Sequence, residues 1–214
     1  MSRVAAVALA AALLAACGGG NAPANNSAAA AVQAGSPVRT ALTEFDRVCG
    51  QVMDRDGYVA AAPGAGWAAF EPAPDSPLGR LIALGQNMAR EAGTQLNQAG
   101  EVSSENSAFR KTANGRELVL LVSEIQIPGM ERSLECRVYD FTAPAPTDAE
   151  IAAWTSVRPE RLNEQGITAY GWRPGFRQGF SRIDVTHLDP SSPLRAQVPV
   201  TGLSVTAFQG PTTD

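Results

Sequence analysis

Apolar residues recur at helical spacing in the first part of the chain and predict two helices there. The first helix follows Ser36-Pro37, a typical helix start because serine caps the first turn and proline suits its fixed backbone. Its apolar positions are Val38, Leu42, Phe45, Cys49 and Val52. We expect this helix to end near Asp56-Gly57.

The second predicted helix follows a stretch of different composition. Residues 59–76 are rich in Ala, Pro and Gly and are interpreted as a loop, with Trp67 and Phe70 folded back onto the core. Ser76-Pro77 then repeats the helix-start signal, and the helix is expected to end near Gly93. Its apolar positions are Leu78, Leu81, Ile82, Leu84 and Met88.

Toward the middle of the chain the pattern changes from helical to extended. Asn114-Gly115 is a strong signal for a two-residue hairpin turn, so residues 109–113 are expected to pair with residues 116–127. Residues 118–122 are apolar at every position, which predicts a strand buried on both faces. Along residues 134–139, Leu, Cys and Val alternate with Glu, Arg and Tyr, which predicts a half-buried strand.

The last third of the chain adds a short helix and more strands. Residues 147–154 predict the helix, with Asp148 and Glu150 in the first turn, where the helix dipole favours acids. Further strands are expected at residues 167–172, 180–188 and 198–208, and Pro199 places the start of the last one at an edge or bulge. Helices followed by a run of strands predict the α+β class. We expect a single domain at residues 38–210, with two N-terminal helices packed on a mostly antiparallel sheet.

The first seventeen residues, MSRVAAVALAAALLAAC, have the organisation of an export signal. Arg3 precedes an apolar run from Val4 to Leu14, which is shorter than the roughly twenty residues that span a bilayer. The run ends in Leu14-Ala15-Ala16-Cys17, which resembles the lipobox of bacterial lipoproteins.

The resemblance to a bacterial lipoprotein implies how this end of the chain is processed. Residues 1–16 would be a signal peptide that is removed, and Cys17 would carry a diacylglyceryl group and a further acyl chain such as palmitate. Two or three acyl chains hold a protein stably on a membrane. Gly18 stands where an Asp tends to retain lipoproteins in the inner membrane, so the outer membrane, facing the periplasm, is expected. Residues 17–37 then form the acylated Cys and an uncharged, flexible tether.

Export also bears on the two remaining cysteines, Cys49 and Cys136, because it places them in an oxidising compartment. A redox pair usually lies close together in sequence, as in Cys-x-x-Cys. These two are far apart, and both lie on predicted apolar faces. We therefore expect a structural disulfide between them.

Composition excludes some function classes. The 214 residues include 17 Lys and Arg against 21 Asp and Glu, a formal charge of −4, which argues against a strongly basic nucleic-acid binder. One His and three Cys leave few nitrogen and sulfur ligands for zinc. Asp54-Arg55-Asp56-Gly57 resembles a fragment of a calcium loop, but the twelfth position, where a Glu is needed, is Ala65. We expect neither a metal nor a cofactor.

Residues that could carry catalysis are few. His187 is the single His, so any Ser-His-Asp or Cys-His mechanism has to use it, and Lys111 is the single Lys. Asp184 and Asp189 could form the acid pair of a glycosidase, although their spacing does not single them out. Each of these four residues also has an ordinary structural interpretation, so no catalytic residue is assigned.

The most unusual local composition lies between Tyr170 and Arg182, where four aromatic residues and three Arg fall within thirteen positions. Aromatic residues and Arg are the types that anchor interfaces. The candidate binding surface consists of Tyr170, Trp172, Arg173, Phe176, Arg177 and Arg182. The alternative interpretation is a hairpin with buried aromatic rings and solvated Arg side chains.

These observations favour a non-catalytic binding or envelope-assembly module, anchored to the membrane through Cys17, with an envelope protein or glycan as partner. Two alternatives stay open: an inhibitor of a lytic enzyme, and a hydrolase of cell-wall or glycan material that uses His187 or an acid pair. Convergence of His187 or two carboxylates in one pocket would favour an enzyme. An exposed patch of aromatic and Arg side chains would favour a binding module.

Overall fold

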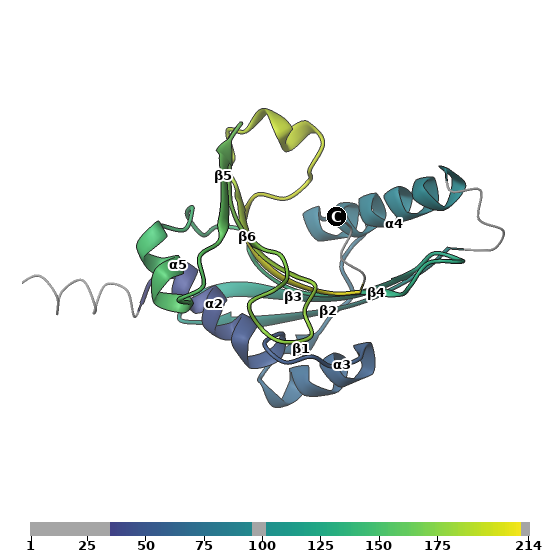
Figure 1. Ribbon diagram of the computed structural model, residues 1–214, viewed down its shortest axis with the longest axis horizontal. Helices are drawn as coiled ribbons and strands as arrows, with labels where there is room; N and C mark the ends of the chain where they lie inside the picture. Colours follow the sequence, from purple (N-terminus) through teal and green to yellow (C-terminus); the bar gives the residue numbers. More distant parts are fainter. Residues whose placement is uncertain (1–34, 96–101, 211–214) are drawn as a thin grey trace, which may run out of the picture.

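Residues 35–95 and 102–210 are described by the computed structural model, which has four α-helices and an eight-stranded antiparallel sheet in that part of the chain (Figure 1). The α+β class predicted from the sequence is therefore confirmed. The expected signal peptide, the lipidation site Cys17 and most of the expected tether lie outside the described residues.

The sheet consists of two antiparallel meanders that meet at its centre. Its strands are β1 (Ala68–Ala69), β2 (Ser103–Ala113), β3 (Arg116–Gln126), β4 (Ser133–Asp140), β5 (Glu160–Glu164), β6 (Ile167–Trp172), β7 (Arg182–Leu188) and β8 (Gly202–Gln209). They are ordered β1-β2-β3-β4-β8-β7-β6-β5, so the pairing of β4 with β8 joins the two halves. Strands β6 and β5 curve toward the side of the sheet on which α4 lies (Figure 1).

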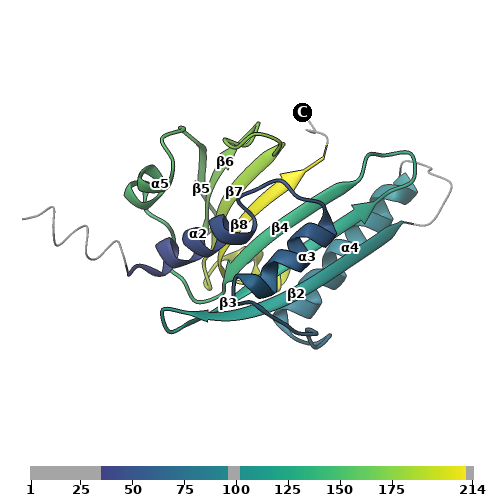
Figure 2. The ribbon, with the colours of Figure 1, turned by 90° about the horizontal axis from the view of Figure 1, so that it is seen from below.

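The helices lie on opposite sides of this sheet (Figures 1 and 2). They are α2 (Pro37–Val48), α3 (Arg55–Gly64), α4 (Pro77–Gln95) and α5 (Asp148–Trp154), with a short 3-10 turn, η1 (Pro193–Ala196). Helices α2, α3 and α5 cover one side, called here the first face, and α4 covers part of the other, the second face. Within the described part of the chain, no helix is both long and apolar enough to cross a membrane.

Helix α2 begins as predicted but ends earlier. Ser36 caps it by accepting a hydrogen bond from the backbone N–H of Arg39 at 3.0 Å. The helix ends at Val48 instead of continuing to Asp56-Gly57. The Asp54 carboxylate accepts from the backbone N–H of Gly57 at 2.7 Å and thereby caps the next helix, α3. The Asp54–Gly57 motif that resembles a calcium loop is thus a helix start.

The prediction of a loop at residues 59–76 was wrong in part, because these residues contain most of α3 and the short strand β1. Alanine is the best helix former, so the run Ala60-Ala61-Ala62 supports α3 until Pro63-Gly64 ends it. Trp67 is buried and Phe70 packs against the core, as predicted.

The disulfide between Cys49 and Cys136 is present, with a Cα–Cα distance of 5.5 Å. Cys49 caps the C-terminus of α2, and Cys136 lies on β4, whose first face is covered by that helix. The bond therefore fixes the end of α2 over the middle of the sheet.

The strand predictions hold best at the hairpin. Asn114 and Gly115 have φ values of 51° and 73°, the left-handed values that a type I′ turn requires. Strand β3 is buried on both faces from residue 118 to residue 123.

Strand β5 was missed because all five of its residues are exposed and no apolar alternation marks it. Strand β8 begins at Gly202, after Pro199 and η1, so the expected start at residue 198 was wrong.

The two faces carry separate apolar clusters. The first face packs Val138, Ile183 and Val205 against Leu42 and Phe45 of α2. The second face has a smaller cluster, formed by Leu78, Ala108, Val119, Leu121 and Tyr139. The remainder of the second face is not apolar, and the candidate site lies there.

Candidate binding groove

Charged and polar side chains gather on the second face of the sheet, over β4, β8 and β7. Side chains alternate along a strand, so Glu135, Arg137 and Tyr139 project opposite to the buried Cys136 and Val138. Strand pairing places residues of neighbouring strands in rows across the sheet. One row is Arg137, Thr206 and Asp184, and the next is Glu135, Phe208 and Arg182.

Two arginines in these rows hold the neighbouring acids. The Arg137 Nη2 atom lies 2.5 Å from Glu135 Oε2, and its Nη1 atom donates to the Tyr139 hydroxyl at 2.8 Å. Arg182 pairs with Asp184 through its Nη2 atom. The Arg182 Cζ atom also lies 4.9 Å from the centre of the Phe208 ring, a distance typical of a cation–π contact.

The protonation states of this cluster follow from burial and charge. Burial lowers the pKa of Arg137, but the neighbouring Tyr139 and Glu135 favour its charged form and raise the pKa overall. Burial raises the pKa of Tyr139 against the opposing effect of Arg137. Near neutral pH, Arg137 is therefore charged and Tyr139 is neutral.

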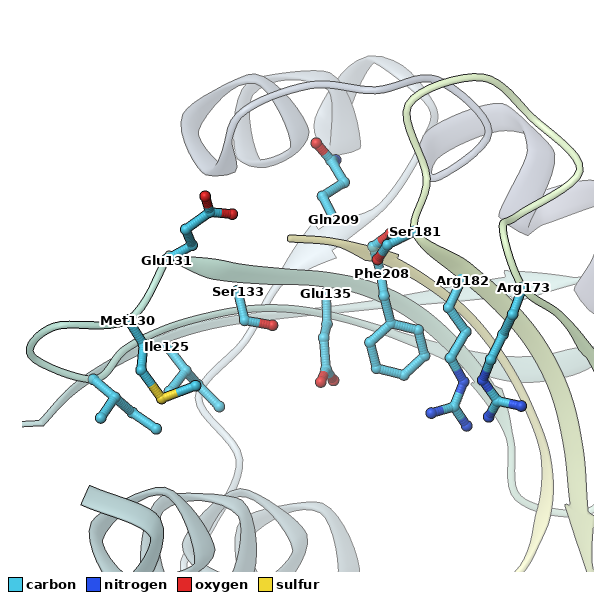
Figure 3. A pocket seen from close by; sticks show the side chains of 11 residues that line it. Ile125, Met130, Glu131, Ser133, Glu135, Arg173, Ser181, Arg182, Phe208 and Gln209 are labelled. Carbon is cyan, nitrogen blue, oxygen red and sulfur yellow. Dashed lines mark hydrogen bonds between the residues drawn. The ribbon is translucent and has the colours of Figure 1, made fainter. Parts of the chain in front are cut away.

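A cavity of about 290 Å³ opens beside this cluster. Its lining combines Arg173, Arg182 and Glu135 with apolar Ile125, Ile127, Met130 and Phe208. Figure 3 shows Arg173, Arg182, Phe208, Glu135, Ile125 and Met130 pointing toward the side on which α4 lies, whereas Glu131 and Gln209 point away from it. The polar and apolar parts of this cavity therefore share one side of the sheet.

A second cavity, of about 430 Å³, lies between α4 and strands β2 to β4. Its helix wall includes Leu84, Gly85 and Met88, and its sheet wall includes Leu121 and Arg137. The two cavities share Ile125, Ile127, Ser133 and Glu135 in their linings. They are therefore neighbours on the second face, and the two together are called here the groove.

The placement of α4 explains why the groove is open. The helix packs on β2, β3 and β4 through Leu78, Leu81 and Ile82, which lie in its first half. Farther along, the Met88 side chain is 61% exposed. The helix does not cover β8, β7 and β6, and these strands form the open side of the groove (Figure 1).

The six residues of the sequence-predicted surface lie on both sides of the sheet. Tyr170 and Trp172 are buried in the first-face core, 2% and 3% exposed. The Tyr170 hydroxyl donates to Asp148 Oδ1 at 2.7 Å, and the Trp172 Nε1 atom donates to the carbonyl of Val157 at 2.9 Å. These two aromatic side chains are therefore held inside the domain.

Phe176 and Arg177 join the same side of the domain. The Phe176 ring centre lies 5.0 Å from that of Trp154 and is in edge contact with it. Arg177 Nη2 lies 2.5 Å from Asp46 Oδ1, and its Nη1 atom donates to the carbonyl of Gly50 at 3.2 Å. These contacts hold the segment before β7 against the end of α2. Of the six residues, Arg173 and Arg182 line the groove.

The residues considered for catalysis do not gather in the groove. His187 is buried on the first face of β7, opposite to Asp184, because adjacent strand residues point to opposite faces. Burial lowers the pKa of His187, while the backbone of Ala143 and the Asp189 carboxylate oppose this shift. Asp189 itself accepts hydrogen bonds from Ser191 at a turn.

Lys111 also belongs to the first face. Its Nζ atom lies 2.6 Å from Glu44 Oε2 and donates to the carbonyl of Ala65 at 2.8 Å. These contacts join β2 to α2 and to the end of α3, a structural role.

Within residues 35–95 and 102–210, no group of three or more His, Cys, Asp or Glu side chains is placed to hold a metal ion.

The sequence interpretation missed the groove residues Glu135, Arg137 and Phe208. The alternation at residues 134–139 predicted that Glu135 and Arg137 lie on the polar face of a strand. It did not indicate which residues of other strands lie beside them. The neighbours of Arg137 come from β8 and β7, which are distant in sequence.

Comparisons with protein-family models, with curated proteins and with solved structures found no match to this chain.

Proposed function

We propose that this chain is an exported binding module, anchored to the envelope through Cys17, that holds its ligand in the groove on the second face of the sheet. The observation that carries the proposal is the hollow between α4 and the uncovered strands, with charged side chains on its floor. The anchor rests on the lipobox resemblance of residues 14–17. The outer membrane, facing the periplasm, is the proposed location.

The composition of the groove favours ligand binding over a purely structural role. Binding sites are concave and mostly apolar, with a few polar groups that orient the ligand. The groove has apolar walls from Ile125, Ile127 and Phe208, and its charges come from a small set of strand residues.

The fate of the candidate catalytic residues favours binding over chemistry. His187 and Lys111 both face the opposite side of the sheet and make structural contacts there. Glu135, which lines both cavities, and Asp184, which lies in the neighbouring row of the sheet, are each paired with an arginine. A general base needs a carboxylate that can reach a substrate proton, and a carboxylate paired with arginine is poorly suited to that role.

The test fills the groove without disturbing the fold. Gly85 lies on α4 and lines the second cavity, and a Cβ atom at this position would meet nothing within 4 Å. Gly85→Trp therefore places a large ring in the groove. Gly64→Trp is the matched control, because Gly64 is also a helical glycine with nothing within 4 Å but lies on α3, on the other side of the sheet.

Each protein is extracted from bacterial envelopes in native nanodiscs and examined by native mass spectrometry for retained molecules. We expect the wild type and Gly64→Trp to carry a bound species that Gly85→Trp lacks. Thermal unfolding checks that both variants fold. Equal retention by all three proteins, or no retained species in the wild type, would contradict binding in the groove.

A further inference from the structure

We propose that the groove takes an amphipathic anion with a single apolar chain. Its anionic head lies between Arg173 and Arg182, and its chain follows the apolar wall toward the cavity beneath α4. This inference rests on the proposed function, because it names the ligand class of the same groove.

The charge balance of the groove points to an anion. Three guanidinium groups belong to it, those of Arg137, Arg173 and Arg182. The acids Glu135 and Asp184 offset two of these charges, because each is already paired with Arg137 or Arg182. Arg173 contacts Glu160 at 3.3 Å, but that acid is 78% exposed to water, where a pair contributes little. Glu131 also lines the first cavity, but its side chain points away from the side on which α4 lies (Figure 3). Arg173 is therefore the guanidinium of the groove with the weakest acidic partner, and a ligand anion can pair with it.

The two outer arginines are placed to hold an anionic head. Both line the first cavity, and Figure 3 shows both side chains pointing toward the side on which α4 lies. The Arg173 and Arg182 side chains are 45% and 41% exposed, so a ligand can reach both. A guanidinium presents paired N–H donors that match the oxygens of a carboxylate or phosphate.

Apolar side chains continue from this charged end. Phe208 lies beneath Arg182, and Ile125, Ile127 and Met130 follow in the same cavity. Ile125 and Ile127 also line the second cavity, whose lining includes Met88 of α4. Methionine side chains adapt to irregular apolar ligands. Cavities of about 290 and 430 Å³ are in the size range of small-molecule sites, roughly 300–1,000 Å³, and together suit one chain.

The same geometry argues against a glycan in this groove. Sugar rings stack on accessible aromatic faces, and the aromatic residues that the sequence suggested for this role, Tyr170 and Trp172, are buried in the first-face core. Phe208 is the aromatic residue that lines the groove, and the Arg182 guanidinium lies over its ring. An apolar chain needs no stacking platform and fits the aliphatic wall.

Binding is measured by equilibrium dialysis of radiolabelled probes against the mature acylated protein in nanodiscs, with empty nanodiscs giving the background from partition into lipid. The probes are decanoate, decyl phosphate and decanol, which share one chain and differ in the head. Decanoate and decyl phosphate distinguish a fatty acid from a phosphate-bearing lipid as the source of the anion. We expect at least one anion to bind saturably and about tenfold or more tightly than decanol.

Arg173→Ala is the principal variant, because Arg173 is half exposed and its loss should not affect folding. We expect it to weaken binding of the anion about tenfold and to leave decanol unchanged. Arg173→Lys, which keeps the charge, should recover part of the affinity. Arg158→Ala is the matched control, because Arg158 is exposed and does not line the groove.

Three results would each overturn the inference. Decanol could bind as tightly as both anions, Arg173→Ala could bind the anion as the wild type does, or neither anion could bind saturably.

These failures are distinct from failure of the proposed function. If Gly85→Trp loses a retained species that is not an amphipathic anion, binding in the groove stands and the ligand class is wrong. If Gly85→Trp retains every species that the wild type retains, binding in the groove itself fails.

Discussion

Asp140 is completely buried at the end of β4, and the Arg116 Nη2 atom of β3 donates to its Oδ1 atom at 2.8 Å. The same carboxylate accepts from the backbone N–H of Thr142 at 3.0 Å. The pair ties the start of β3 and the end of β4 to the segment that leads to α5. Removing one partner of a buried pair leaves the other without compensation.

Asp140→Asn should lower the free energy of unfolding by about 2 kcal/mol at neutral pH, measured by urea denaturation. Asp56→Asn is the control, because that side chain is 91% exposed and should matter little. If the two variants lost equal stability, the buried pair would not have the proposed role.

The contribution of Asp140 should also depend on pH. Burial raises the pKa of its carboxyl, but hydrogen bonds from Arg116 and Thr142 outweigh burial and hold the pKa below the ordinary 3.8. The stabilisation is therefore present above the ordinary pKa and is lost as the pH falls through the lowered value. The stability difference between wild type and Asp140→Asn should shrink between about pH 5 and pH 3. A difference that grew on acidification would contradict this.

The disulfide of Cys49 and Cys136 closes a loop across 87 positions. Its removal should therefore increase the conformational entropy of the unfolded chain. Cys49→Ser/Cys136→Ser should lose about 4 kcal/mol of unfolding free energy and accumulate poorly in cells. The measurements are urea denaturation and immunoblotting, with reduced wild type as the comparison. Wild-type stability and abundance in the double variant would refute a structural role for the bond.

Arg177 and Arg173, only four positions apart, should have opposite roles. Arg177→Ala breaks the contacts with Asp46 and Gly50, so it should lower the free energy of unfolding by about 1–3 kcal/mol and leave binding of the anion intact. Arg173→Ala should weaken binding and leave stability within about 0.5 kcal/mol of the wild type. Calorimetric unfolding and dialysis on both variants provide the comparison. If Arg177→Ala lost binding but kept full stability, the binding site would lie on the first face and not in the groove.

The proposed lipid anchor on Cys17 can be tested separately. Cys17→Ser removes the thiol that would accept the diacylglyceryl group, so labelling of the protein by a clickable fatty acid should disappear. Ser27→Ala, a change in the same segment, should label like the wild type. Persistent labelling of Cys17→Ser would rule out lipidation at this residue.

Local patterns were sufficient to predict much of the fold. The Ser36-Pro37 start of α2, the Asn114-Gly115 turn and the doubly buried β3 depend on neighbouring residues, and each is found in the structure. Helix α3 and strand β5 were missed for a physical reason. An Ala-rich run and an exposed polar edge strand both lack the apolar periodicity that marks an element.

The site could not be found in the same way. The cluster of Tyr170, Trp172 and Arg177 stands out in composition, but its side chains hold the domain together. Arg137 and Arg182 meet the groove because β4 pairs with β8 and β8 with β7, and this strand order is not sequential. A pattern read along one strand contains no information about such neighbours.

The most direct test of ligand binding in the groove is a nuclear magnetic resonance titration of the ¹⁵N-labelled protein with decanoate and, separately, with decyl phosphate. Binding in the groove predicts saturable shifts in backbone amide signals near Arg182 and Phe208, and near Gly85 on α4, with little change on α2 and α3. The account would be contradicted by shifts confined to the first face, around Trp154 and Arg177, or by the absence of a saturable shift with either anion.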